Sequence, residues 1–147
     1  MAGILSGHIV LASATERVTL ASTTKIAAFT DTDPTDLFGG FTAIIDWGDG
    51  TTSPGTITGS NGSFSVEGGH SYSDEGNFTL SATIVRSSDN ATITDTGNIA
   101  VAEHDALAAQ GTTIIGNPGT LLNNVTVATF TDTDTAAVAG DFQAIVD

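Results

Sequence analysis

The stretch GTITGSNGSFSVE, residues 55–67, has the pattern of a β-hairpin. Asn61-Gly62 is the preferred centre of a two-residue type I′ turn, because both residue types tolerate positive φ. A turn at this point pairs residues whose numbers sum to 123, namely Ile57 with Val66, Gly59 with Phe64, Thr58 with Ser65, and Thr56 with Glu67. The first two pairs make an apolar face and the other two a polar face. We therefore expect a half-buried hairpin.

Segments on both sides of the hairpin alternate apolar and polar residues with the period of a β-strand. The inward sets are Phe41, Ala43, Ile45 and Trp47 in one strand, and Phe78, Leu80, Ala82 and Ile84 in another. Further strands are expected near residues 8–12, 18–21, 26–29 and 91–101, with a polar turn at 86–90. No stretch has a convincing helical period. Seven or so short strands predict an all-β fold, an antiparallel immunoglobulin-like β-sandwich.

The charge of the chain limits its partners. Its 147 residues carry 17 carboxylates against three basic side chains, a formal charge of −14. This excess repels phosphate backbones and anionic lipid headgroups, so neither nucleic acid nor membrane insertion is expected. It suits divalent cations with a preference for oxygen ligands, of which calcium is the natural choice. The chain has no cysteine, which rules out disulfides, thiolate metal sites and a cysteine nucleophile.

The chain contains an internal repeat. The pentapeptide FTDTD occurs at residues 29–33 and again at 130–134, and a shift of 101 superimposes residues 29–46 on 130–147 with 10 of 18 positions identical. Such a period is the size of one immunoglobulin-like domain and indicates a tandem array. We expect one complete repeat over residues 3–102 and the leading half of a second over 103–147, about one and a half repeats in all.

The leading half of the second repeat carries apolar side chains without the strands that cover them in the first. Exposed apolar side chains and an open strand edge favour association. We expect the partners to be neighbouring repeats or other copies of the same chain, joined by strand addition or swapping into a homo-oligomer or filament. The alternative is that this segment packs loosely and has no partner.

Two motifs resemble a known family. They are DWGDGT at residues 46–51 and HSYSDEGNFTL at residues 70–80, in that order, and together they resemble the PKD-like repeats of bacterial surface proteins. The FTDTD leader is similar to the version found in large secreted adhesin-type exoproteins. The resemblance implies an immunoglobulin-like module outside the cell or on the bacterial surface. It also implies that carboxylates entering the GDG turn, Asp46 and Asp49, are calcium ligands.

Calcium and turn chemistry are the two interpretations of the acidic loops. Carboxylates at Asp31, Asp33 and Asp36 are spaced so that a loop can wrap them around one ion. Asp and Pro also form turns, in which the Asp side chain accepts a backbone N–H two residues on. The predicted calcium ligands are Asp31, Asp33, Asp46 and Asp49. His70 and Tyr72 are expected to be structural, with the Tyr72 hydroxyl bonded to nearby backbone and Trp47 in the core.

No hydrolase or phosphate-binding signature is present in the sequence, and we expect no enzymatic activity. The predicted function is that of a structural repeat, either a spacer or stalk or a self-assembling subunit. The alternative is an adhesive module that recognises a glycan or a host protein, for which Phe38 and Tyr72 are the aromatic candidates outside the core pattern.

Overall fold

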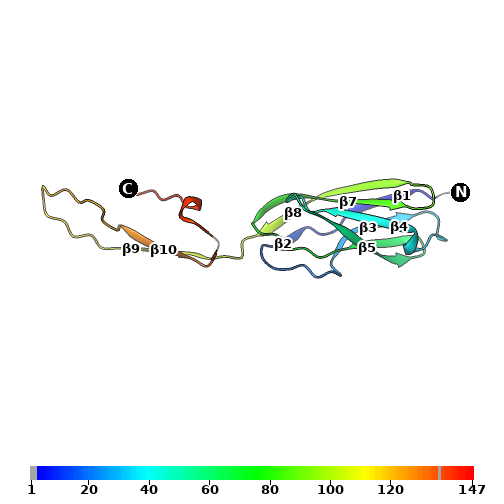
Figure 1. The fold of residues 1–147 in the computed structure, drawn as a ribbon, viewed down its shortest axis with the longest axis horizontal. Helices are drawn as coiled ribbons and strands as arrows, with labels where there is room; N and C mark the ends of the chain where they lie inside the picture. Colours follow the sequence, from blue (N-terminus) through cyan, green and yellow to red (C-terminus); the bar gives the residue numbers. More distant parts are fainter. Residues whose placement is uncertain (1–2, 136) are drawn as a thin grey trace. The chain divides into compact units, whose positions relative to one another are not determined.

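A computed structural model of the protein describes residues 3–135 and 137–147 (Figure 1). The chain divides into two compact units, the first ending at His104 and the second running from Asp105 to Asp147. We call them unit 1 and unit 2 and describe each by itself. The described residues contain no helix with the length and hydropathy needed to cross a membrane.

Unit 1 consists of eight strands and one short 3-10 helix. The elements are β1 (Leu5–Ile9), β2 (Ser13–Thr15), β3 (Lys25–Asp31), η1 (Phe38–Gly40), β4 (Phe41–Asp46), β5 (Thr52–Ser60), β6 (Ser63–Glu67), β7 (Gly76–Arg86) and β8 (Thr92–Ala102). The strand order is β1-β3-β6-β5-β4-β7-β8-β2. All neighbours are antiparallel except β2 and β8, which are parallel.

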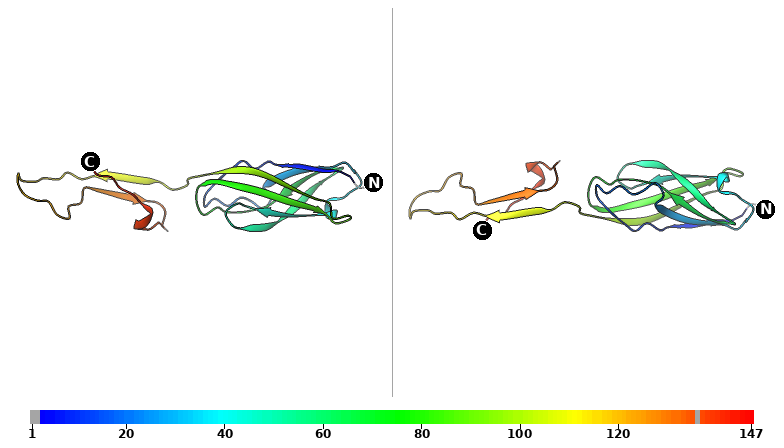
Figure 2. Two further views of the ribbon diagram at one scale, coloured as in Figure 1. Left: turned by 90° about the horizontal axis from the view of Figure 1, so that it is seen from above. Right: turned by 90° about the horizontal axis from the view of Figure 1, so that it is seen from below.

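The sheet folds over itself at β5. The first part of β5 pairs with β4, and the part from Thr56 onward pairs with β6. A side chain at Gly55 is excluded, because its Cβ would lie 2.5 Å from Val66 Cγ1. The strands curl around a shared interior (Figure 2), and β1 packs against β8, where a Cβ on Gly97 would lie 2.8 Å from Ile9 Cβ. Unit 1 is therefore an immunoglobulin-like β-sandwich, as the sequence predicted.

The hairpin that led to this prediction has the predicted register. Ile57 pairs with Val66 and Gly59 with Phe64, and Asn61 and Gly62 take φ of 55° and 75° at the turn. Inward-facing residues of all the longer strands form one core. Its buried members include Ile26, Phe29, Phe41, Ile45, Trp47, Phe64, Val66, Tyr72, Leu80, Ile84 and Ile99.

One predicted strand is wrong. Residues 18–21 form a loop, and the short strand β2 lies just before them at Ser13–Thr15. The apolar side chain of Leu20 packs against the core from this loop, and its N–H donates to the His70 carbonyl oxygen at 2.7 Å. The alternation of apolar and polar residues made this segment resemble a strand in sequence. In the structure it bonds to another loop and does not pair as a strand.

Unit 2 contains the strands β9 (Leu107–Gly111) and β10 (Ala128–Asp132), paired antiparallel, and the 3-10 helix η2 (Ala139–Asp141). No other strand is present among its described residues. Most of its large apolar side chains are exposed, including Ile115, Leu121, Phe130, Val138, Ile145 and Val146.

Unit 2 reproduces the local structure of the leading part of unit 1. Leu107 pairs with Asp132 as Leu5 pairs with Asp31. The N–H of Ala106 donates to Thr133 Oγ1 at 2.8 Å, as the N–H of Ile4 donates to Thr32 Oγ1 at 2.8 Å. The helices η1 and η2 begin 101 residues apart. Two statements about the domains remain predictions. The first is that unit 2 is the leading half of a second repeat, and the second is that the repeats divide at residue 102.

Candidate functional site

Asp31 and Asp33 lie where β3 ends and the chain turns toward η1. Asp31 Oδ1 accepts the N–H of Asp33 at 2.9 Å, and Asp33 Oδ1 accepts the N–H and the hydroxyl of Thr35 at 3.0 and 2.6 Å. Hydrogen bonds from Thr35 lower the pKa of Asp33. Both carboxylates therefore make the turn contacts that the sequence analysis gave as the alternative to calcium.

Asp46 and Asp49 make the same kind of contact in the turn that follows β4. Asp46 Oδ1 accepts the N–H of Gly48 at 3.0 Å, and Asp49 Oδ1 accepts the N–H and the hydroxyl of Thr51 at 3.0 and 2.6 Å. Gly48 and Gly50 take φ of 81° and 88°, conformations that favour glycine. The sequence WGDG is thus accounted for by the geometry of one tight turn.

The four predicted calcium ligands form two separate pairs. Arg86, which contacts Asp31, pairs with Phe41 at the start of β4, whereas Asp46 is the last residue of that strand. At about 3.3 Å per residue, β4 separates these two ends by about 17 Å. One ion cannot bridge that distance, so calcium binding by these residues, which remains a prediction, requires two independent sites.

Arg86 is buried and holds the Asp31 end together. Its exposed fraction is 2%, and its guanidinium donates to Asp31 Oδ2 at 2.6 Å, to Asp89 at 2.8 and 3.0 Å, and to the Gly3 carbonyl oxygen at 2.9 Å. Hydrogen bonds to Asp89 and then to Asp31 raise the pKa of Arg86. The arginine that the sequence placed in a polar turn is therefore the centre of a buried ion-pair network, and Asp31 neutralises it.

Trp47, Asp49, His70 and Tyr72 form a packed group beside the WGDG turn. The His70 ring stacks on Trp47 with centroids 4.5 Å apart, and His70 Nε2 lies 2.7 Å from Asp49 Oδ2. The Tyr72 hydroxyl donates to the Trp47 carbonyl oxygen at 3.0 Å, and burial raises the pKa of Tyr72 to about 12. A tyrosine held neutral and bonded to backbone is a structural group, as predicted for Tyr72, and Trp47 is fully buried as predicted.

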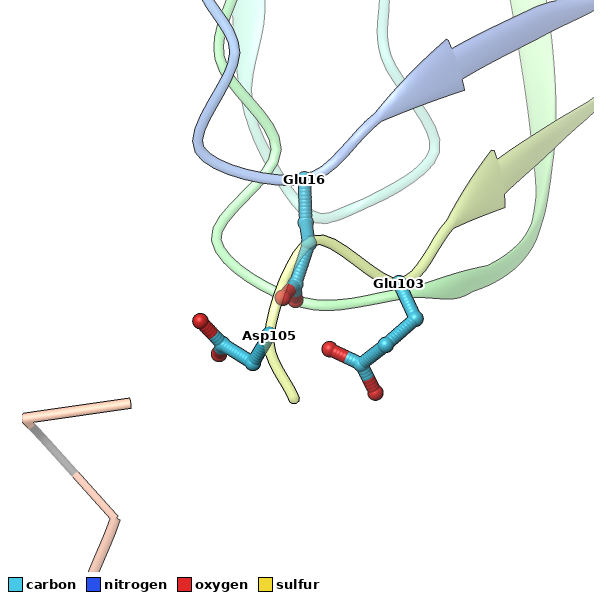
Figure 3. Close-up of side chains that lie close together, drawn as sticks. All are labelled: Glu16, Glu103 and Asp105. Atoms are coloured by element: carbon cyan, nitrogen blue, oxygen red, sulfur yellow. The ribbon is translucent and has the colours of Figure 1, made fainter. Parts of the chain in front are cut away.

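A cluster of carboxylates that the sequence analysis did not select lies at the end of β2. Glu16, Asp74 and Glu75 each place one carboxylate oxygen within 4.8 Å of the others. Glu16 is 2% exposed and its Oε1 accepts the N–H of His104 at 3.3 Å. Figure 3 shows the Glu16 carboxylate beside that of Glu103. We call Glu16, Asp74, Glu75 and Glu103 the acidic cluster.

The parallel pairing of β2 with β8 brings Glu16 and Glu103 together. Thr15 pairs with Ala102, so the next residue of each strand lies at the same level of the sheet. Burial, and then a hydrogen bond with Glu103, raise the pKa of Glu16. Contact with Asp74 raises the pKa of Glu75. These carboxylates oppose one another's ionisation, and a cation between them would relieve that repulsion.

The spacing in the acidic cluster suits a calcium-sized ion. Calcium lies about 2.3–2.6 Å from its oxygen ligands, so two oxygens on one ion are up to about 5 Å apart. The oxygens of Glu16, Asp74 and Glu75 fall within that limit. No spacing rule in the sequence could have selected them, because Glu16 and Asp74 come from loops that only the folded sheet brings together.

The comparisons with known proteins find similarity among solved structures. No protein family and no curated protein matches the sequence. A solved structure of the PKD domain of an M14-like peptidase from Thermoplasmatales archaeon SCGC AB-540-F20 is 19% identical, with a TM-score of 0.44, over 69% of this chain and 97% of that one. The sandwich fold of unit 1 rests on its own strand pairing and core, and membership of the PKD-like family remains a prediction.

Proposed function

We propose that this protein is a non-enzymatic structural repeat of an extracellular or bacterial surface protein, and that it acts as a spacer or stalk. The observation that supports this proposal is the second copy of the leading strands. Ala27 to Asp31 pair with Leu5 to Ile9, and Ala128 to Asp132 pair with Leu107 to Gly111, so the pairing recurs at a shift of 101 residues in one strand and 102 in the other. The same Asx turn follows, with the side chains of Asp31 and Asp132 as acceptors. Chains built from repeated domains of one design carry load and set distance.

Two groups of unit 1 that could perform chemistry support the same proposal, because they are engaged in holding the fold. Asp49 and His70 bond to each other beside a buried tryptophan, and Arg86 is enclosed by carboxylates. The sequence is rich in Ser, Thr and Gly and poor in Lys, a composition common in extracellular β-proteins.

Force spectroscopy on the whole chain tests the spacer function. A spacer unit should unfold in one cooperative event, and about 100 residues extended at about 3.4 Å each lengthen the chain by about 34 nm. Gradual extension of unit 1 with no unfolding peak would contradict the proposal. A variant with Phe64→Ala, which removes a ring from the core, serves as a control that should unfold at lower force.

Self-assembly through unit 2 is the second candidate, and the exposure of its apolar side chains favours it. Phe130 is 49% exposed and Val146 68% exposed, whereas their counterparts Phe29 and Ile45 are 2% and 0% exposed. Size-exclusion chromatography with light scattering at several concentrations tests it. A strict monomer whose unit 2 is cut readily by protease would exclude self-assembly.

An adhesive role is the remaining alternative, and the loop before β4 favours it. Leu37 and Phe38 are 70% and 56% exposed there. Tyr72, the other aromatic candidate, is buried and does not offer a binding surface. If the loop binds a glycan or a host protein, Phe38→Ser should abolish binding to cells or to a glycan array without lowering the melting temperature.

Calcium is proposed as a stiffening ligand of the repeat. The chain supplies three places for it: the Asp31/Asp33 turn, the Asp46/Asp49 turn and the acidic cluster. In the two turns, one oxygen of each Asp accepts a backbone N–H, whereas the acidic cluster contains carboxylates that repel one another. Melting in millimolar calcium and in chelator tests the proposal, and equal melting temperatures in the two would contradict it.

A further inference from the structure

An acidic residue interrupts the apolar inner face of β8. The residues of this strand that face the interior of unit 1 include Ile93, Asp95, Gly97 and Ile99, and both isoleucines pack on the core. Asp95 is half-buried, and its Oδ2 atom is shielded from solvent. No hydrogen-bond donor in the part of the chain that the structure describes reaches this oxygen. A shielded carboxylate oxygen without a donor is uncommon in folded proteins, and it disfavours the ionised form of the group.

The Asp95 carboxyl group lies against the backbone of β1 at Gly7. A Cβ at Gly7 would overlap Asp95 Oδ2 and would lie 3.0 Å from the carbonyl oxygen of Ala28 on β3. Beside this contact, Ile9 of β1 packs over Gly97 of β8. We call Gly7, Ile9, Asp95 and Gly97 the β1-β8 seam. The seam combines a close apolar contact with a close contact to a carboxyl group, so the ionisation of that group affects how tightly β1 docks.

Burial dominates the environment of Asp95. It raises the pKa of this carboxyl group above 3.8, and the charge of His8 on β1 opposes the shift. The charged residues of the other strands around the seam are Arg86 at the end of β7 and Lys25 and Asp31 at the two ends of β3. Arg86 and Asp31 form a buried ion pair with each other. Asp95 and His8 are therefore the groups whose titration bears on the seam.

We propose that Asp95 is a pH-dependent switch for β1, and that its protonated carboxyl group favours docking of the strand on β8 while its ionised form favours release. When β1 leaves the seam, water reaches the carboxylate and the pKa returns toward 3.8. The ionised form therefore opposes docking, and docking becomes more favourable as the pH falls through the pKa of the docked state toward 3.8. At higher pH the strand opens more often and exposes the edge of β3 that it covers.

Two backbone amides distinguish the opening of β1 from the unfolding of unit 1. The N–H of Val10, the residue after β1, donates to the Ile26 carbonyl oxygen at 2.9 Å and reports on β1. The N–H of Gly68, the residue after β6, donates to the Thr24 carbonyl oxygen at 3.0 Å and serves as the internal control. A melting temperature does not make this distinction, because acid also removes the stabilising contribution of the Asp49 carboxylate.

Amide exchange measured by NMR on the whole 14.8 kDa chain tests the proposal. Each rate is expressed as a protection factor, relative to the exchange of an unfolded chain at the same pH. We expect the protection of Val10 to increase at least about threefold as the pH falls from about 7 to about 4, and that of Gly68 to change much less. Asp95→Asn, which cannot ionise, should show high protection of Val10 at both pH values.

The matched control is His8→Gln, which removes the other titratable group. An ordinary histidine titrates in the same pH range, so the natural chain alone does not separate the two residues. The His8→Gln chain should keep the response of Val10 to pH. Gly7→Ala places a methyl group against Asp95 Oδ2 and should lower the protection of Val10 throughout the range while leaving Gly68 unchanged.

Four outcomes would overturn the proposal. They are a protection of Val10 that does not depend on pH, an equal response of Val10 and Gly68, a response that persists in Asp95→Asn, and a response that is lost in His8→Gln. The last would assign the switch to the histidine. The spacer function would survive all four, because it depends on cooperative unfolding of unit 1 under force and not on the pH at which β1 opens.

Discussion

The Tyr72 hydroxyl donates a hydrogen bond of 3.0 Å to the carbonyl oxygen of Trp47, and both residues are almost fully buried. This bond ties the loop before β7 to the end of β4. It also satisfies a carbonyl at the point where β4 gives way to the WGDG turn. A buried carbonyl without a partner is unfavourable, so the tyrosine supports the turn as well as the core.

Removing this hydroxyl should destabilise unit 1. Tyr72→Phe keeps the ring and leaves the Trp47 carbonyl oxygen buried without its donor, at a loss of about 1–3 kcal/mol in the free energy of unfolding. Urea denaturation followed by tryptophan fluorescence measures the change. The matched control is Thr42→Ala, which removes an exposed hydroxyl from β4 and should change stability by less than about 0.5 kcal/mol. Equal effects of the two substitutions would contradict the role given to the bond.

Replacing Arg86 should be among the most damaging single changes. Arg86→Met leaves Asp31, which is 4% exposed, buried without its cation. An uncompensated buried charge opposes folding, whereas removing both charges of a buried pair is tolerated much better. We therefore expect Arg86→Met to shift the urea midpoint strongly downward and Arg86→Met with Asp31→Asn to recover most of the loss. A double variant no more stable than the single one would refute this explanation.

Acid should destabilise unit 1 in part through Asp49. Burial raises the pKa of Asp49, but hydrogen bonds from Thr51 and His70 outweigh burial, and the pKa lies below the usual 3.8. A carboxylate with a lowered pKa contributes stability above the unfolded value, and this contribution is lost as the pH falls through the folded value. Asp49→Asn should therefore flatten the dependence of the unfolding free energy on pH as the pH falls below the usual carboxyl pKa of 3.8. An unchanged slope in that range would contradict the prediction.

The acidic cluster has the opposite dependence on pH. Because the pKa of Glu16 is raised above 4.5, its ionised form opposes folding, and stability increases as the pH falls through the folded-state pKa toward the unfolded value of 4.5. Glu16→Gln keeps an acceptor for the N–H of His104 and removes the repulsion from Glu103. We expect this variant to melt at a higher temperature than the natural chain at pH 7 in chelator, as calorimetry would show.

Calcium distinguishes the acidic cluster from the Asp turns. An ion bound at about 100 times its dissociation constant stabilises the folded state by about 2.7 kcal/mol. If it binds the cluster, calcium should raise the melting temperature of the natural chain and of Asp46→Asn, but not that of Glu16→Gln. If Asp46→Asn alone loses the response, the ion binds the WGDG turn instead. A natural chain that melts identically with and without calcium would exclude binding at all three proposed sites.

The sequence predicted most of the strands of unit 1 because short-range rules decide them. The Asn61-Gly62 turn sets the register of the β5-β6 hairpin, and strict alternation marks the buried faces of β4 and β7. Residues 18–21 form a loop and not the expected strand, because an apolar loop that packs on the core has the same sequence pattern as a short strand.

The candidate site was less predictable. Turn chemistry at Asp31, Asp33, Asp46 and Asp49 follows from local sequence, and the structure shows these turn contacts at all four. Their separation into two pairs depends on the length of β4, and the burial of Arg86 depends on loops far apart in the chain. Neither can be obtained from residue spacing.

Local sequence is sufficient to define the repeat, the hairpin register and the turns, since each depends on residues that are neighbours in the chain or on identity at a fixed shift. Tertiary structure alone decided the parallel pairing of β2 with β8, and with it the approach of Glu16 to Glu103. These features depend on contacts between segments distant in sequence, and such contacts form only where the whole sheet buries its apolar face.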